Sequence, residues 1–239
     1  MNKDTLVSEL LNLNIELSEI QLKQIEDFCL FLLEENKKYN LTAIRELDDV
    51  FLKHVYDSLT IVKVLDLDKD QTLLDIGSGA GFPGIILQIV FPKLKVTLLD
   101  SNGKKTQFLE LVKKRLKLAN LKIINARAED YIQNMRGTYD VVTARAVASL
   151  NVLIELAIPF LKVKGIFIAM KSEINNEIIL AKDTCLFLEC KIENTKELYL
   201  PVEKSKRTLV IIKKLSPTPN KYPRRYDQII KKPLKRTRK

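Results

Sequence analysis

The sequence is poor in the features that mark disulfide-rich secreted proteins, metal-binding proteins and membrane-spanning proteins. It has three cysteines among 239 residues, with no CxxC spacing, so it suggests neither a disulfide framework nor a zinc site. No stretch approaches the roughly 20 apolar residues of a membrane-spanning helix, and the N-terminus lacks the apolar run of a signal peptide. We therefore expect a cytoplasmic, monomeric protein with no metal and no membrane contact.

Acidic residues are scarce at the C-terminal end. Residues 221–239 contain nine Lys or Arg and one Asp, whereas the other 220 residues contain 31 basic and 29 acidic groups. Such a basic tail predicts contact with nucleic-acid phosphates, because each bound cation releases a condensed counterion. A solvated tail that only aids solubility is the alternative. Four prolines between 217 and 233 predict that this tail forms no regular element.

Hydrophobic spacing divides the chain into three segments. Residues 1–66 are expected to be helical, 67–214 to alternate between strands and helices, and 215–239 to be the basic tail. Such alternation predicts an α/β fold of the Rossmann-like type with a mainly parallel sheet. The expected strands are 72–77, 95–100, 122–126, 139–145, 165–171, about 185–199 and 207–213. The main expected helices are 19–38, 48–65, 84–91, 102–119, 149–160 and 173–183.

Glycine is also scarce, yet four of the seven glycines fall within the stretch "DIGSGAGFPG" at 75–84. This turn follows the first expected strand, and ligands bind at the carboxyl edge of an open parallel sheet. Read from Gly79, it gives the G-x-G-x-x-G pattern of dinucleotide sites. Read from Asp75, it gives an acidic residue before G-x-G-x-G, which suits S-adenosylmethionine. A turn needed only for packing is the third interpretation.

The neighbours of these glycines favour S-adenosylmethionine. Asp75 precedes Gly77, where a fixed negative charge would repel a pyrophosphate but attract an amino-acid ammonium. Pro83 removes one backbone donor from any phosphate cradle. Asp100 ends the second expected strand and can accept hydrogen bonds from the ribose of either cofactor.

Three further strand ends carry candidate binding residues. After the third strand, Ala128 and Glu129 fall where an adenine would lie, with a carboxylate for its exocyclic amine; alternatively, Glu129 only favours the start of a short helix. Arg145 ends the fourth strand, where its guanidinium can hold a phosphate or an acceptor base. A surface ion pair is the alternative for Arg145. Lys171 ends the fifth strand in the same way.

The order of several motifs resembles that of one known family. Across residues 40–172 the chain contains, in this order, "NLTAIRE", "FLKHVYDSL", "LLDIGSGAGFPGI", "VTLLDSNGKKTQFL", "ARAEDY", "YDVVTARAVASL" and "IAMKS". Together they resemble the RsmG family, also called glucose-inhibited division protein B, whose members methylate guanine N7 in bacterial small-subunit rRNA.

The resemblance implies a class I methyltransferase with a helical N-terminal extension that acts on small-subunit rRNA or the 30S particle. It also implies cofactor contacts from Gly77, Phe82, Ala128, Glu129 and Arg145, beside the contacts expected from Asp75, Gly79 and Asp100. The only histidine, His54, is by itself more typical of a core or capping residue. The family resemblance instead makes His54 a candidate for the pocket entrance.

Guanine N7 methylation requires no catalytic base, because N7 keeps an unshared lone pair and alignment is most of the work. Methylation at a pyrimidine C5 would need a cysteine nucleophile, but Cys29, Cys185 and Cys190 are expected to be packing residues. Two other functions stay open at this point. One is an NAD-dependent oxidoreductase, and the other is a non-catalytic RNA-binding module that relies on the tail.

Overall fold

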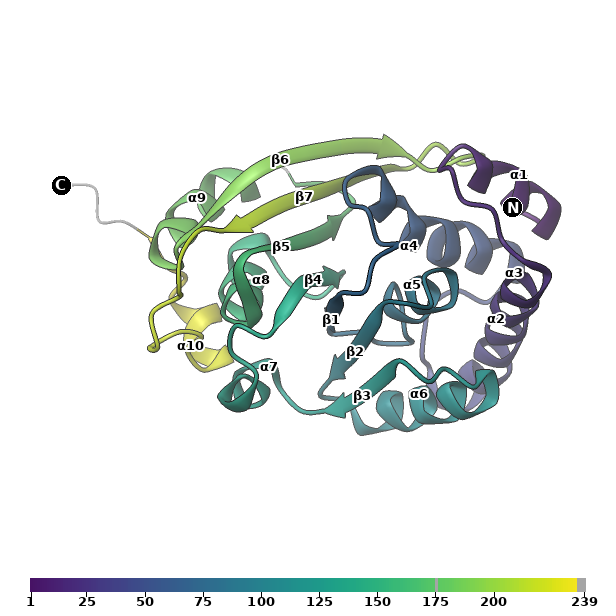
Figure 1. Ribbon diagram of the computed structural model, residues 1–239, viewed down its shortest axis with the longest axis horizontal. Coiled ribbons are helices and arrows are strands. Elements are labelled where there is room, and N and C mark those ends of the chain that lie inside the picture. The colour runs from purple at the N-terminus through teal and green to yellow at the C-terminus, as the bar shows by residue number, and fades with distance from the viewer. Residues whose placement is uncertain (175, 236–239) are drawn as a thin grey trace.

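A single mixed sheet organises the molecule. The computed structural model describes residues 1–174 and 176–235. Within them, seven strands form one sheet in the order β3-β2-β1-β4-β5-β7-β6 (Figure 1). The strands are β1 (Thr72–Ile76), β2 (Lys95–Asp100), β3 (Leu121–Asn125), β4 (Tyr139–Arg145), β5 (Leu161–Lys171), β6 (Cys190–Tyr199) and β7 (Lys206–Lys214). Strands β1 to β5 are parallel, and β7 is antiparallel to both of its neighbours, so the predicted mainly parallel α/β fold is confirmed.

Helices cover both faces of this sheet (Figure 1). One face carries α1 (Lys3–Leu11), α2 (Glu19–Tyr39), α3 (Leu47–Val50), the π-helical turn η1 (Phe51–Tyr56), α4 (Asp57–Leu59), the 3₁₀ turn η2 (Thr60–Lys63), α5 (Gly84–Val90) and α6 (Gly103–Leu116). The other face carries α7 (Ala128–Tyr131), η3 (Ile132–Asn134), α8 (Leu150–Ala157), η4 (Ile158–Phe160), α9 (Glu177–Phe187) and α10 (Tyr226–Lys231). None of the described helices is both long and apolar enough to cross a bilayer.

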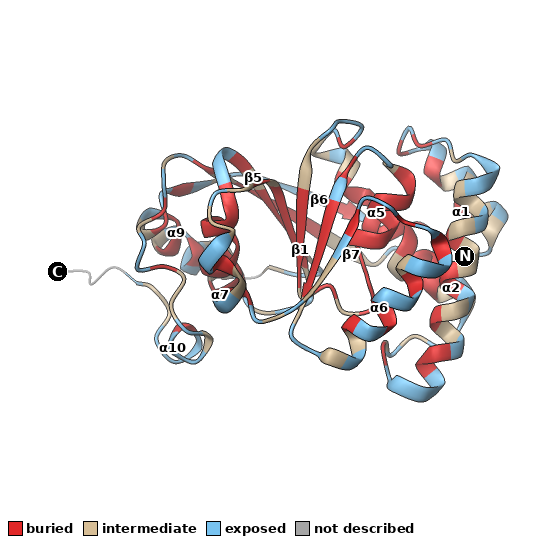
Figure 2. Ribbon diagram, turned by 60° about the horizontal axis from the view of Figure 1, so that its bottom comes forward, coloured by how far each residue is buried: buried red, intermediate tan, exposed pale blue. Residues whose placement is uncertain are grey.

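The N-terminal helices share a core with the sheet. Phe28 of α2 is fully buried in the same cluster as Leu73 of β1 and Phe108 of α6. Figure 2 shows the buried strands between two helical layers whose outer surfaces are exposed. Helix α2 begins at a capping box in which Ser18 and Gln21 satisfy each other's backbone N–H groups. The first 66 residues therefore pack as one face of the domain.

The C-terminal segment contains a regular helix, which corrects the prediction that its prolines exclude one. Helix α10 covers Tyr226–Lys231. Pro223 precedes it and Pro233 follows it, so the prolines lie at positions that a helix tolerates. The last four residues of the expected tail, 236–239, lie outside the described residues.

The strand order places the ligand-binding edge. Strand β1 pairs in parallel with β2 on one side and β4 on the other, so the chain adds β2 and β3 on one side of β1 and then crosses to add β4 and β5 on the other. The turns that follow β1 to β5 all leave from the same carboxyl edge, where open α/β sheets bind ligands.

Candidate active site

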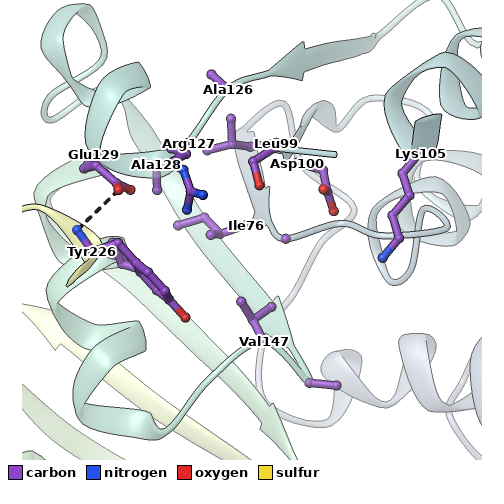
Figure 3. A pocket seen from close by; sticks show the side chains of 14 residues that line it. Ile76, Leu99, Asp100, Lys105, Ala126, Arg127, Ala128, Glu129, Val147 and Tyr226 are labelled. Carbon is purple, nitrogen blue, oxygen red and sulfur yellow. Dashed lines mark hydrogen bonds between the residues drawn. The ribbon is translucent and has the colours of Figure 1, made fainter. Parts of the chain in front are cut away.

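A cavity of about 300 Å³ lies at the carboxyl edge, beside the glycine-rich turn (Figure 3). Its walls come from the ends of β1, β2, β3 and β4, from the start of α6 and from α7, α8 and α10. The lining residues are Ile76, Gly77, Leu99, Asp100, Ser101, Lys105, Ala126, Arg127, Ala128, Glu129, Ala146, Val147, Leu156 and Tyr226. This cavity, the first cavity below, is of the size that small-molecule sites have.

Two glycines of the turn are required by close contacts. Gly77 has φ +69°, and a Cβ atom there would lie 2.6 Å from Cγ2 of Val147. At Gly84, the first residue of α5, a Cβ atom would lie 2.2 Å from Leu98. The N–H of Gly84 also donates to Oδ2 of Asp75 at 2.9 Å. Contacts with Asp75 and Leu98 therefore hold Gly84, at the end of the turn, against the sheet, while Gly77 lines the cavity.

Replacing Gly77 by alanine is expected to weaken binding of S-adenosylhomocysteine at least tenfold. The left-handed backbone would cost about 1–2 kcal/mol with a Cβ atom, and the added methyl group would displace Val147 from the cavity wall. Isothermal titration calorimetry measures the effect. Gly103→Ala is the matched control, because a Cβ atom there meets nothing closer than 3.8 Å. Equal affinity in both variants would contradict the assignment of the turn.

The predicted cofactor residues fall into two groups. Gly77, Asp100, Ala128 and Glu129 line the first cavity. The others support the turn or lie outside this cavity. Gly79 donates its N–H to Oδ2 of Asp100 at 2.8 Å.

Asp75 and Phe82 are buried near the turn and do not line the first cavity. Asp75 is fully buried, and its Oδ1 has no hydrogen-bond partner among the described residues. Phe82 is 4% exposed and stacks on the ring of His54, with centroids 4.5 Å apart. Direct cofactor contacts from these two side chains therefore remain predictions.

A second cavity, of about 400 Å³, adjoins the first. Its lining residues are Ile44, Lys53, His54, Asp57, Arg145, Ala146, Met170, Lys171, Ser172 and Arg207. Ala146, which directly follows β4, lines both cavities. All three residues that the sequence suggested for substrate binding, His54, Arg145 and Lys171, lie here. Four basic side chains and one aspartate give this cavity a positive balance.

Arg145 is the centre of a hydrogen-bond network in the second cavity. Its Nη1 donates to Oδ2 of Asp57 at 3.0 Å and to the carbonyl of Lys53 at 3.1 Å. Its Nη2 lies 3.1 Å from Nδ1 of His54. The same Nδ1 lies 3.1 Å from the carbonyl oxygen of Lys53, and Nε2 lies 2.9 Å from Oγ1 of Thr42, so both ring nitrogens of His54 have polar partners. The alternative of a surface ion pair is right about the pairing, which is with Asp57, but not about the surface, because the side chain of Arg145 is only 14% exposed.

Asp57 and Lys171, which also line this cavity, each pair with a further side chain of opposite charge. Asp57 is 4% exposed and also pairs with Nε of Arg207 at 3.2 Å. Lys171 donates to the carbonyl of Ala148 at 2.9 Å and pairs with Glu177 at 3.0 Å. Lys171 therefore ties the loop after β4 to the start of α9.

The π-helical turn η1 positions His54 and places Asp57 beside it. The sequence predicts one continuous helix over 48–65, but the structure divides it into α3, η1, α4 and η2. The wider π turn directs His54, Asp57 and the carbonyl of Lys53 together toward Arg145. Turns of this kind recur at functional sites. Apolar periodicity cannot distinguish them from an ordinary α-helix.

Two buried groups in this region have opposite pKa shifts. Burial, with the charge of Arg145, lowers the pKa of His54 from 6.5 to about 3. Burial raises the pKa of Asp75 from 3.8 to about 7, against the opposing effects of the Gly84 N–H and Arg145. His54 is therefore neutral at pH 7, and so it does not supply a charge to the second cavity.

These shifts predict opposite pH dependences of stability in two variants. His54 takes up its proton first in the unfolded chain, so its contribution to the free energy of unfolding is lost as pH falls from 6.5 toward 3. Asp75 takes up its proton first in the folded chain, so its contribution rises as pH falls from 7 toward 3.8. In the wild type, these two pH-dependent contributions to the free energy of unfolding largely cancel.

Urea unfolding between pH 6.5 and 5 should separate them. On acidification, His54→Gln is expected to gain stability relative to the wild type, and Asp75→Asn to lose it. Each slope is at most about 1.4 kcal/mol per pH unit. Parallel curves for the wild type and both variants would contradict the shifts.

Sequence reasoning missed several lining residues. Tyr226 of the first cavity and Arg207 of the second had no signal, since they come from the tail and a late strand with no motif. Val147 lies in the motif "YDVVTARAVASL", but nothing in that motif marked it as a lining residue. Lys105 had a signal, because it stands in the first turn of the helix that follows Asp100.

Comparison with known proteins identifies the family. The family model described as "GidB: rRNA small subunit methyltransferase G" matches residues 21–210. The chain belongs to this GidB family. Among its GidB relatives, "Ribosomal RNA small subunit methyltransferase G" of Lactococcus lactis is 44% identical over 98% of this chain and 100% of its own length. The protein of the same name from Bacillus subtilis is 41% identical, covering 98% and 99%.

Solved structures extend the fold comparison beyond the GidB family. An AdoMet complex of TYW2 from M. jannaschii is similar with a TM-score of 0.53 at 17% identity, covering 67% of this chain and 74% of that one. A SAM-dependent O-methyltransferase from Thermotoga maritima has a TM-score of 0.53 at 17% identity, covering 77% and 71%. The GidB fold seen here is thus that of class I methyltransferases.

Proposed function

We propose that this protein transfers a methyl group from S-adenosylmethionine to N7 of a guanine in small-subunit rRNA. The observation that carries the proposal is the pair of cavities that meet at Ala146. The first offers carboxylates and apolar walls for an adenosine, and the second offers cations for a nucleotide. The names of its relatives support rRNA as the substrate class.

The residues of the first cavity fit S-adenosylmethionine. Ile76 and Leu99 supply apolar surface for an adenine, while Glu129 and Asp100 offer carboxylate oxygens for its amine and for the ribose hydroxyls. The unpartnered Oδ1 of Asp75 lies below the turn, where it favours a cationic ammonium. Contacts from Gly79 and Phe82 to the cofactor are part of the proposal, whereas Arg145 lines the second cavity and is assigned to the acceptor nucleotide.

The second cavity suits a guanine nucleotide. Arg145, Arg207 and Lys171 present donors, whereas guanine O6 and the RNA phosphates present acceptors. When bound, S-adenosylmethionine supplies an activated methyl group that guanine N7 attacks with its own lone pair. No residue has to remove a proton, which agrees with the pKa of about 3 for His54, because so weak a base takes up a proton poorly at pH 7. The role of the protein is to align the acceptor.

The form of the substrate, the cellular location and the oligomeric state belong to the same proposal. We propose the 30S particle as the form of the substrate, the cytoplasm as the place of reaction and a monomer as the active state. The oxidoreductase alternative has less support, because the chain belongs to the GidB family, whose relatives are named as rRNA methyltransferases.

Methyl transfer to isolated 30S subunits tests the proposal. Labelled methyl donor, followed by chemical cleavage at 7-methylguanine, should give one cleaved site in 16S rRNA. Label without cleavage would refute the N7 assignment. Binding of RNA with no transfer to any ribosomal RNA would instead support the non-catalytic module, and saturable NADH binding without binding of S-adenosylhomocysteine would support the oxidoreductase.

A further inference from the structure

The chain after β7 folds back onto the domain instead of extending from it. Tyr222 and Ile229 are 5% and 1% exposed and belong to the core beneath α8 and α9. Arg136 donates to the carbonyls of Asn220 and Tyr222. Figure 1 shows α10 beside α7 and α8. The described part of this basic segment is therefore built into the domain.

A buried ion pair fixes the segment just before α10. Glu155 of α8 is 1% exposed, and it accepts from the backbone N–H of Arg224 at 3.0 Å, from its Nε at 2.8 Å and from its Nη2 at 2.6 Å. Nη1 of Arg224 donates to the carbonyl of Lys232 at 2.9 Å, past the end of α10. Arg224 thus holds both ends of the helix in place.

This anchoring brings Tyr226 to the first cavity. Its side chain lines the cavity, and its backbone N–H donates to Oε1 of Glu129 at 3.3 Å. Figure 3 shows the ring along one side of the cavity, with Ala128 and Ile76 across from it. One oxygen of Glu129 is therefore held by the segment, which orients the carboxylate and leaves Oε2 for a ligand.

We propose that Tyr226 is a cofactor-binding residue whose ring closes the adenine end of the first cavity and whose amide orients Glu129. The inference rests on the proposed function. An aromatic ring opposite an apolar wall suits a purine, because base–aromatic stacking stabilises such complexes. The segment that the charge count assigns to RNA contact thus has a second role, in which residues 220–232 serve the cofactor.

Binding of S-adenosylhomocysteine, measured by calorimetry without RNA, tests this inference. Tyr226→Ala is expected to raise Kd about 10- to 30-fold, whereas Tyr226→Phe, which keeps the ring, should stay within threefold. Tyr226 is only partly buried, so both variants should fold, and thermal unfolding without ligand confirms it. Tyr199→Ala is the matched control, because Tyr199 lies on β6 with 60% exposure.

Steady-state kinetics separate this role from a structural or RNA-binding one. Tyr226→Ala should raise KM for S-adenosylmethionine in parallel with Kd, while KM for 30S subunits stays unchanged. An unchanged Kd for S-adenosylhomocysteine would overturn the inference, whether or not KM for 30S subunits rises. If the wild type methylates no ribosomal RNA but Tyr226→Ala still loses affinity, the proposed substrate fails and the role of Tyr226 stands.

Discussion

Replacing Arg145 by methionine is expected to lower kcat/KM for methyl transfer to 30S subunits by about 1,000-fold, a loss of about 4 kcal/mol of transition-state stabilisation. Arg145 contacts Asp57, His54 and Lys53 at once and faces the second cavity. Arg145→Lys should lose about 100-fold, because an ammonium cannot span the same partners. Single-turnover rates with saturating S-adenosylmethionine measure the effect.

Affinity for S-adenosylhomocysteine should change less than threefold in both Arg145 variants. The reason is that Arg145 lines the second cavity and not the first. Arg115→Met is the control, because Arg115 pairs with Asp27 at 2.6 Å on the exposed surface of α6. If both variants lose cofactor affinity and transfer rate in equal measure, then Arg145 acts as a cofactor contact, as the family resemblance implies.

The second large effect is expected at the ion pair beneath α10. Arg224→Met should lower the free energy of unfolding by about 3 kcal/mol, because it leaves Glu155 charged and unpaired in the core. For a chain of this size, the melting temperature should fall by about 6–12 °C. Urea and thermal denaturation measure both quantities.

The neighbouring arginine provides a matched control for this prediction. Arg225 has an 83% exposed side chain and a long 3.7 Å ion pair with Asp227, so Arg225→Met should change stability by less than about 0.5 kcal/mol. Adding Glu155→Leu to Arg224→Met should restore much of the loss, since the buried charge is then gone. Equal stability of the two single arginine variants would mean that Glu155 is not held by Arg224.

The strands and their binding edge were predictable because they depend on local patterns. Short apolar runs predicted β2, which ends at Asp100, and β4, which ends at Arg145, with their observed bounds. Parallel pairing then brings the residues after each strand to one edge, so Gly77, Asp100 and Glu129 were found without knowledge of the structure.

The missed features depend on contacts between distant parts of the chain. Arg224 and Glu155 are 69 residues apart in sequence, and no spacing rule connects a buried glutamate of α8 to a basic tail. Charge counting alone assigned the tail to solvent or RNA. Likewise, the partners that keep Arg145 from being an isolated surface residue lie about 90 residues away, at Lys53, His54 and Asp57.

Ala146 illustrates a compromise between stability and function. Its φ is +54°, in the left-handed region that glycine adopts without cost, and an alanine there carries strain of about 1 kcal/mol. Glycine would relieve that strain, but it would also remove a methyl group from the boundary between the two cavities. An engineer who optimised this chain for thermostability alone would therefore choose glycine at the position where donor and acceptor are expected to meet. The backbone strain at Ala146 thus lies at the boundary between the two cavities, at a position where a design for stability alone would remove it.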